Sequence, residues 1–333
     1  INGDLTNNNT ISAGTGAFHF TGASLAQNIN GTVQMYSMIV DNSLGLTINN
    51  SLSVQGWLNI ISGTLTTNNA LTLQSNSTGT AAFYRPDAGD ISGDYTVERF
   101  LDEGESYYLL APVVSGGDLE DWNQEFEMQG FTGTEWPGGI SSVYYYDQNN
   151  ISTSYYDGYT VPTNTLDILD PKVGYEIYVG NDSKATGTRT IDISGTPVLG
   201  NVSYTCPHLV KTGNPTDDGW SLITNPYPAP LKWWTVTKSA NYDAAYVKRN
   251  TGARQSINNL WTLGSGEAFW VHSNPGGTTL DFFSIYAGFD KDITDTYNLK
   301  TTTSLEDPVL DIKLSYTHNN LAEVNYTYLG FSD

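Results

Sequence analysis

Tryptophans are the residues in this chain whose type and clustering most suggest a binding surface. Trp220, Trp233, Trp234, Trp261 and Trp270 fall within one segment, and exposed indole rings stack on the apolar faces of sugars. Trp220 and Trp270 lie in alternating, strand-like stretches, where packing in a core is the default interpretation. Trp233 and Trp234 follow a proline-rich run, and adjacent residues there face different ways. These two are therefore the candidate carbohydrate platform, and one of them is expected to be exposed.

Aspartates supply the second candidate site. Asp87, Asp90 and Asp94 fall in one turn-rich stretch, and carboxylate and carbonyl oxygens are the ligands of Ca²⁺. The stretch does not match the twelve-residue calcium loop, because no closing Glu is placed correctly. The alternative is a solvated turn, which is the commoner use of exposed Asp. No other cofactor is indicated.

No catalytic constellation stands out. The four histidines are scattered, without an HExxH pair, and the chain has neither a GxSxG elbow nor a phosphate-binding loop. A glycosidase would need two carboxyl groups about 5–10 Å apart. The only nearby set, Asp118, Glu120 and Asp121, is expected in a solvated loop. We therefore predict a protein that is not an enzyme.

Charge and cysteine content limit the partners and the compartment. The 333 residues include 14 basic and 35 acidic ones, for a net charge of −21, which repels nucleic acid and anionic membrane surfaces. No apolar run approaches the roughly 20 residues that span a bilayer, so neither nucleic acid nor membrane insertion is expected. Cys206 is the single cysteine and cannot form an internal disulfide. This composition favours a bacterial exported protein.

Gly, Asn, Thr and Ser crowd the predicted turns between short alternating segments, which predicts an all-β fold. In residues 1–86, similar Leu- and Asn-containing phrases begin at Leu5, Leu25, Leu46 and Leu65. A period near 20 of short strands and Asn or Gly turns predicts a right-handed β-solenoid, or β-helix. Inward aliphatic residues would form the stacked core, and Asn side chains could form ladders along the turns. An evenly spaced β-meander is the alternative.

The rest of the chain contains a duplicated pattern. Residues 107–122 read YYLLAPVVSGGDLEDW, and residues 219–234 read GWSLITNPYPAPLKWW. Later strand-like segments follow in the same order in both halves, with loops of different length. Such variation around kept strands predicts tandem antiparallel β-sandwich units at 87–205 and 206–303. Residues 304–333 read as the start of a further β unit, cut short. The NPYPAP run is expected to be a rigid structural connection.

The second copy of the pattern resembles a known group of proteins. The segment GWSLITNPYPAPLKWW, followed by GSGEAFWV at 264–271, is similar to the "GWNLIGNPYPSPIDW … GQGFFV" pattern of large secreted surface proteins of Bacteroidota. The Asn- and Thr-rich front segment and residues 310–331 also resemble parts of those proteins. The resemblance implies export by the type IX secretion route and a role as adhesin, surface scaffold or enzyme appendage. It implies no shared catalytic residues.

These observations lead to two hypotheses for function. The first is an extracellular structural or adhesive protein of a bacterial cell surface, such as a subunit of a self-associating filament or surface-layer scaffold. Its partners would be further copies of itself, joined end to end or by strand edges, or a surface polysaccharide. The alternative is a carbohydrate-binding accessory region of a secreted enzyme that acts on polysaccharide.

Overall fold

Strands dominate the computed structural model, which describes residues 1–8, 11, 14–22, 24–84, 89–101, 106–180, 189–248, 254–288, 310–318 and 321–329. They make up 48% of the chain against 7% helix, which confirms the all-β prediction. Within those ranges, none of the helices is long and apolar enough to cross a membrane. Contacts divide the chain into two compact units, residues 1–300 and 301–333.

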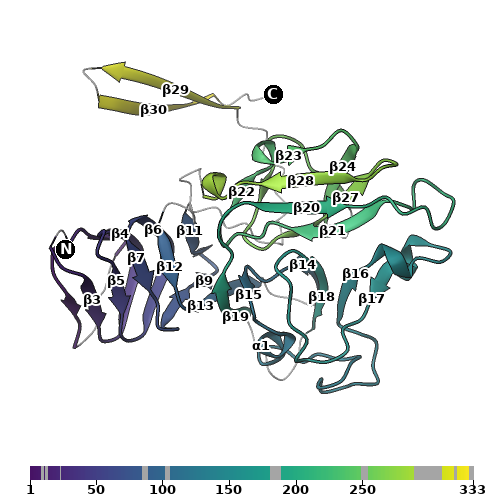
Figure 1. The fold of residues 1–333 in the computed structure, drawn as a ribbon, viewed down its shortest axis with the longest axis horizontal. Coiled ribbons are helices and arrows are strands. Elements are labelled where there is room, and N and C mark those ends of the chain that lie inside the picture. The colour runs from purple at the N-terminus through teal and green to yellow at the C-terminus, as the bar shows by residue number, and fades with distance from the viewer. Residues whose placement is uncertain are drawn as a thin grey trace. The chain divides into compact units, whose positions relative to one another are not determined.

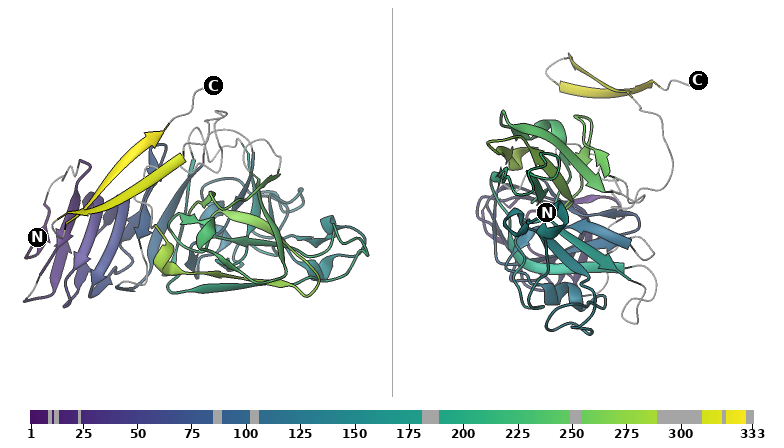
Figure 2. Two further views of the ribbon diagram at one scale, coloured as in Figure 1. Left: turned by 90° about the horizontal axis from the view of Figure 1, so that it is seen from above. Right: turned by 90° about the vertical axis from the view of Figure 1, so that its right-hand side faces the viewer.

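A β-solenoid of about four turns forms the front of the first unit, as predicted. Each coil supplies one strand to each of two parallel ladders, whose strands lie side by side (Figures 1 and 2). The first ladder contains β1 (Leu5–Thr6), β3 (Gln27–Asn30), β5 (Leu46–Ile48), β7 (Thr64–Thr66) and β12 (Asp90–Ser92). The second contains β2 (Ala17–Phe20), β4 (Val33–Asp41), β6 (Leu52–Ser62), β8 (Leu71–Leu73) and β13 (Tyr95–Leu101), with β11 (Ala82–Tyr84) also paired to β6. A small hairpin joins β9 (Ser75–Asn76) to β10 (Gly79–Thr80).

The repeat works by stacking equivalent aliphatic side chains. Leu46 pairs with Leu65 on neighbouring coils, and both are 1% exposed or less, because alternate residues of a strand face the same side. Asn side chains link successive coils, as expected. The Asn49 Nδ2 atom donates to Asn30 Oδ1 at 2.9 Å, and the Asn50 Oδ1 atom accepts from the Gly31 amide at 2.9 Å.

The predicted register of the first two phrases is wrong. Leu5 pairs with Ile29, whereas Leu25 lies in a turn and is 76% exposed. Gln27 takes an inward position instead, and its buried amide donates to the Gly3 carbonyl at 2.7 Å. The side-chain amide can be buried there because its hydrogen bonds are satisfied.

The solenoid does not end at the predicted boundary near residue 86. Strands β12 and β13 continue the two parallel ladders through Asp90–Thr64 and Val97–Leu73 pairs. On its other side, β13 pairs antiparallel with β19 (Arg189–Pro197), which pairs in turn with β15 (Val114–Ser115). One sheet therefore runs from the solenoid into the first β unit.

The two β units repeat the same pattern of strand pairing. In the first unit, the second sheet has the order β14 (Ser106–Leu110), β18 (Tyr175–Val179), β16 (Val143–Tyr146), β17 (Tyr159–Thr160). In the second unit, the corresponding sheet is β21 (Trp220–Thr224), β27 (Ala268–Ser273), β24 (Tyr242–Lys248), β25 (Arg254–Ser256). The order β13-β19-β15 is repeated as β20 (Val202–Cys206), β28 (Thr278–Phe282), β23 (Thr237–Lys238). The tandem arrangement was thus predicted, although β20 begins before the predicted boundary at 206.

Short elements complete the description. They are α1 (Leu119–Asn123), the pair β22 (Leu231–Lys232) and β26 (Thr262–Leu263), and 3-10 turns at Gln148–Asn150, Tyr155–Gly158, Trp233–Thr235 and Ser284–Tyr286. In the second compact unit, β29 (Leu310–His318) and β30 (Leu321–Leu329) form an antiparallel hairpin. The sequence predicted this hairpin.

Candidate functional site

The two candidate tryptophans have opposite environments. They begin a 3-10 turn, in which successive side chains point to different sides. Trp233 is 2% exposed and packs edge-on against Phe269, with ring centroids 5.4 Å apart. It therefore offers no ring face to a sugar. Trp234 is 56% exposed and lies beside Tyr286 at 6.2 Å, so the candidate platform is reduced to Trp234.

The proline-rich run before them is a buried turn. The fully buried Asn225 side chain donates from Nδ2 to the carbonyls of Ala229 at 2.8 Å and Gly264 at 2.9 Å. The buried Tyr227 hydroxyl contacts the carbonyls of Gly200 and Phe282 at 2.9 and 3.0 Å. These bonds satisfy carbonyl groups that would otherwise be buried without partners. The proline-rich run therefore has a structural role.

The aspartates proposed for calcium point to different neighbours. Asp90 is at the start of β12 and accepts from Thr64 Oγ1 at 3.4 Å, while Asp94 accepts from Thr196 Oγ1 at 2.9 Å. Asp87 lies outside the described residues. Within the described part of the chain, no three His, Cys, Asp or Glu side chains are grouped to hold a metal ion.

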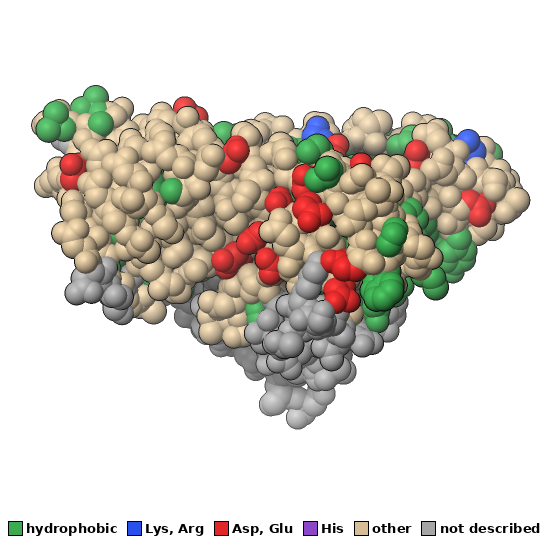
Figure 3. All heavy atoms as spheres, turned by 90° about the horizontal axis from the view of Figure 1, so that it is seen from below, with side chains coloured by type: hydrophobic (Ala, Val, Ile, Leu, Met, Phe, Trp, Pro, Cys, Tyr) green, Lys and Arg blue, Asp and Glu red, His purple; other side chains and the backbone are tan. Residues whose placement is uncertain are grey.

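Asp118, Glu120 and Asp121, the carboxylates considered as a catalytic set, were expected in a loop. They lie instead at the N-cap and in the first turn of helix α1. Asp118 caps α1 by accepting from the Glu120 amide at 3.0 Å, and the buried side chains of Leu119 and Trp122 anchor the helix. Asp118 is thus used as a cap. Figure 3, which views the side of the molecule that carries α1, shows acidic side chains gathered near the middle of the face.

Four carboxyl groups near α1 have a raised pKa. Partial burial is the main cause for Glu98, Asp121, Glu125 and Asp192. The negative charge of Asp192 raises the pKa of the other three further. Glu98 and Asp192 lie directly opposite each other on β13 and β19. This acidic cluster (Glu98, Asp121, Glu125 and Asp192) is a site of electrostatic repulsion.

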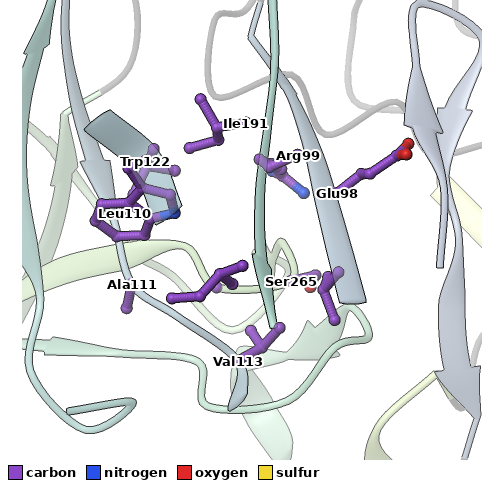
Figure 4. A pocket seen from close by; sticks show the side chains of 11 residues that line it. Glu98, Arg99, Leu110, Ala111, Val113, Trp122, Ile191 and Ser265 are labelled. Carbon is purple, nitrogen blue, oxygen red and sulfur yellow. The ribbon is translucent and has the colours of Figure 1, made fainter. Parts of the chain in front are cut away.

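A small cavity lies between the sheets close to this cluster (Figure 4). Its walls include Leu110, Trp122 and Ile191 of the first β unit and Ser265 of the second. The volume is about 30 Å³, which is about the space that one water occupies. The cavity is therefore too small for an organic ligand.

A larger hollow lies where the two β units meet. We call it the junction cleft; it has a volume of about 300 Å³. The first unit contributes residues 146–149, from the end of β16 onward, and residues 172–173. The second contributes residues 203–205 of β20, Pro207 and Leu209 after it, and residues 220–223 of β21. The cleft is therefore built from four segments that are distant in sequence.

The Gln148 side chain joins the two β units by hydrogen bonds beside the cleft. Its Nε2 atom donates to the Pro207 carbonyl at 2.8 Å and to Ser221 Oγ at 3.1 Å, and its Oε1 atom accepts from the Leu209 amide at 3.1 Å. The side chain is 5% exposed. An aromatic contact supports the same junction, because Tyr146 packs on Trp270 at 4.7 Å. The cleft walls are therefore held in a defined geometry.

Aromatic and polar side chains share the lining. Tyr146 and Trp220 are half-buried, whereas Asn149, Lys172 and Thr205 are exposed. Because Asn149 and Lys172 lie in connections that differ in length between the duplicated halves, the cleft has no counterpart in the sequence pattern. The length differences were the one sequence signal that could have directed attention to these loops.

Cys206 and two histidines have structural environments. The Cys206 thiol is fully buried, and burial raises its pKa to about 11, so it is not an accessible nucleophile. The His272 Nδ1 atom lies 2.7 Å from Asp243 Oδ2, and its Nε2 atom lies 3.0 Å from the Asp218 carbonyl. His208 Nδ1 lies 2.6 Å from the Ser273 carbonyl. These contacts join loops to strands of the second β unit.

Comparison with known proteins gives no family for this chain. No family model matches it, no curated protein matches it, and no solved structure matches it. The functional argument therefore depends on the residues and their arrangement.

Proposed function

We propose that the chain is part of an extracellular structural and adhesive protein of a bacterial cell surface, and that it is not an enzyme. One observation carries the proposal: a solenoid sheet continues into the first of two β units that share the same strand order. Stacked and repeated β elements form extended frameworks whose stability comes from neighbour contacts. Such a framework suits the display of binding surfaces, and the motif resemblance to secreted surface proteins of Bacteroidota supports the same role.

The proposal includes export by the type IX route and a choice of partners. Further copies of the chain, paired at strand edges, and a surface polysaccharide are the two partners that fit. No cofactor is required by this role. Calcium at Asp87, Asp90 and Asp94 stays a prediction, which a titration of Ca²⁺ monitored by calorimetry would test.

Protease treatment of intact cells tests the location. Antibody against the chain should detect its cleavage when protease is added to intact cells of the source bacterium, while a cytoplasmic marker stays whole. Protection of the chain until the cells are lysed would contradict the proposal. Sedimentation of the purified chain over a range of concentrations then shows whether copies associate.

The alternative function, a carbohydrate-binding accessory region of a secreted enzyme, is favoured by one observation. Trp234 is exposed beside Tyr286, and a part-exposed pair of aromatic rings can stack on a sugar. Under this alternative, the W234A variant should lose binding to polysaccharide.

A further inference from the structure

We propose that the junction cleft binds a carbohydrate. The inference deepens the proposed adhesive function, on which it rests for the choice of ligand class, by assigning it a site away from Trp234. The volume of about 300 Å³ lies at the lower end of the range for ligand pockets. A space of that size accommodates one or two sugar rings.

The aromatic walls of the cleft are rigid. Trp220 donates from Nε1 to the Thr216 carbonyl at 2.9 Å and lies 4.7 Å from the His272 ring. Tyr146 is held by Trp270 at 4.7 Å and by Tyr159 at 5.6 Å. Side chains that are already fixed lose little entropy when a ligand binds. Their ring surfaces suit the apolar faces of sugars.

The polar groups of the cleft include both donors and acceptors. Asn149 is oriented by its own contacts, because its backbone amide and Nδ2 both donate to Asp147 Oδ1, at 2.9 and 2.8 Å. Lys172 adds a donor, and the Thr205 hydroxyl on the outer face of β20 can donate or accept. Sugar hydroxyl groups also donate and accept, so a mixed lining matches them.

An anion and an extended peptide fit the cleft less well than a carbohydrate does. An anion would face Asp147 as well as Lys172, in a chain of net charge −21. An extended peptide would need free backbone groups on a strand edge. On β21 the Leu222 carbonyl already accepts from the Gly174 amide at 3.2 Å. A neutral oligosaccharide is therefore the ligand proposed.

The test is binding of the purified chain to an array of neutral oligosaccharides of glucose, mannose and N-acetylglucosamine, followed by calorimetry with the best binder. N149A and K172A should each weaken binding by about three- to tenfold, as expected for loss of one hydrogen bond. T205W places an indole in the cleft from an exposed position and should abolish binding. Circular dichroism should confirm that each variant is folded.

W136A is the matched control, because Trp136 is 64% exposed and does not line the cleft; it should bind like the wild type. Failure of the wild-type chain to bind any of the sugars would overturn the inference. So would loss of binding in W234A with unchanged binding in T205W, which would place the site at Trp234. The extracellular location of the chain is tested separately, by protease treatment of intact cells. A negative result there is therefore distinguishable from a failure of the cleft to bind carbohydrate.

Discussion

The pairing of Glu98 with Asp192 places two carboxylates opposite each other across β13 and β19. Like charges in that position are destabilising, by about 0.2 to 1 kcal/mol. The pKa of both groups is raised, chiefly by burial. A carboxyl group with a raised folded-state pKa holds its proton more tightly in the folded state. The loss of folding stability caused by the ionised carboxyl group is therefore fully present at neutral pH, and it disappears as the pH falls through the raised pKa.

We expect the D192N variant to unfold at a higher urea concentration than the wild type at pH 7. The increase in the free energy of unfolding should be about 0.2 to 1 kcal/mol. It should shrink toward pH 4, where the wild-type carboxyl groups take up protons. The control is D90N, which removes the same charge where the cross-strand neighbour is Thr64. An equal gain in both variants would show that net charge, and not the pair, is responsible.

At the residue scale, the sequence indicated which residues were candidates for a site, but it could not indicate how buried they are or which residues they contact. It placed Trp233 and Trp234 after a turn but could not say which one is buried, because the 3-10 turn that orients them depends on packing against Phe269. It also could not bring Glu98 and Asp192 together, since their pairing depends on the long connection between β13 and β19.

At the scale of elements, close approach between coils sets a strict requirement at Gly63. Its φ is +78°, and an added Cβ would lie 1.8 Å from the Asn42 carbonyl oxygen. Backbone atoms of the neighbouring turn cannot move aside as a flexible side chain could. The solenoid turn therefore requires glycine at this position.

We predict that G63A lowers the free energy of unfolding by at least about 2 kcal/mol, from left-handed strain together with the clash. Urea denaturation followed by circular dichroism measures the change. G3A is the control, because a Cβ at Gly3 meets no atom within 4 Å. If the two variants have the same stability, the turn at Gly63 is adaptable and the argument fails.

The alternation of strands and the repeat predicted the solenoid and the tandem β units. Register was less predictable. Leu25 resembles the leucines at 46 and 65 in its local sequence, yet Gln27 is buried nearby because the surrounding carbonyl and amide groups satisfy its side chain. The junction cleft could not be predicted, because its segments come together only when the two β units pack on each other, through contacts such as those of Gln148.

At the scale of the first compact unit, Gln148 couples the two β units. Its removal would leave the Leu209 amide and the Pro207 carbonyl without this partner. We expect Q148A to cost about 1 to 3 kcal/mol and to separate the unfolding of the two β units into distinct calorimetric transitions. N150A is the control, because Asn150 bonds to Thr160 within the first unit. A single, unshifted transition in Q148A would show that the other contacts between the units, such as the hydrogen bonds from Ala111 to Gly266 and from Gly174 to Leu222, couple them without Gln148.

The antiparallel pairing of β19 with the last solenoid strand has a consequence for aggregation. A parallel ladder ending in an open strand is a template on which another coil, or a strand from another molecule, can add. At β13 the neighbouring position is taken by β19, which runs in the opposite direction. The first β unit therefore acts as an end-stop for this ladder, so that growth of the solenoid by templated addition is blocked on that side.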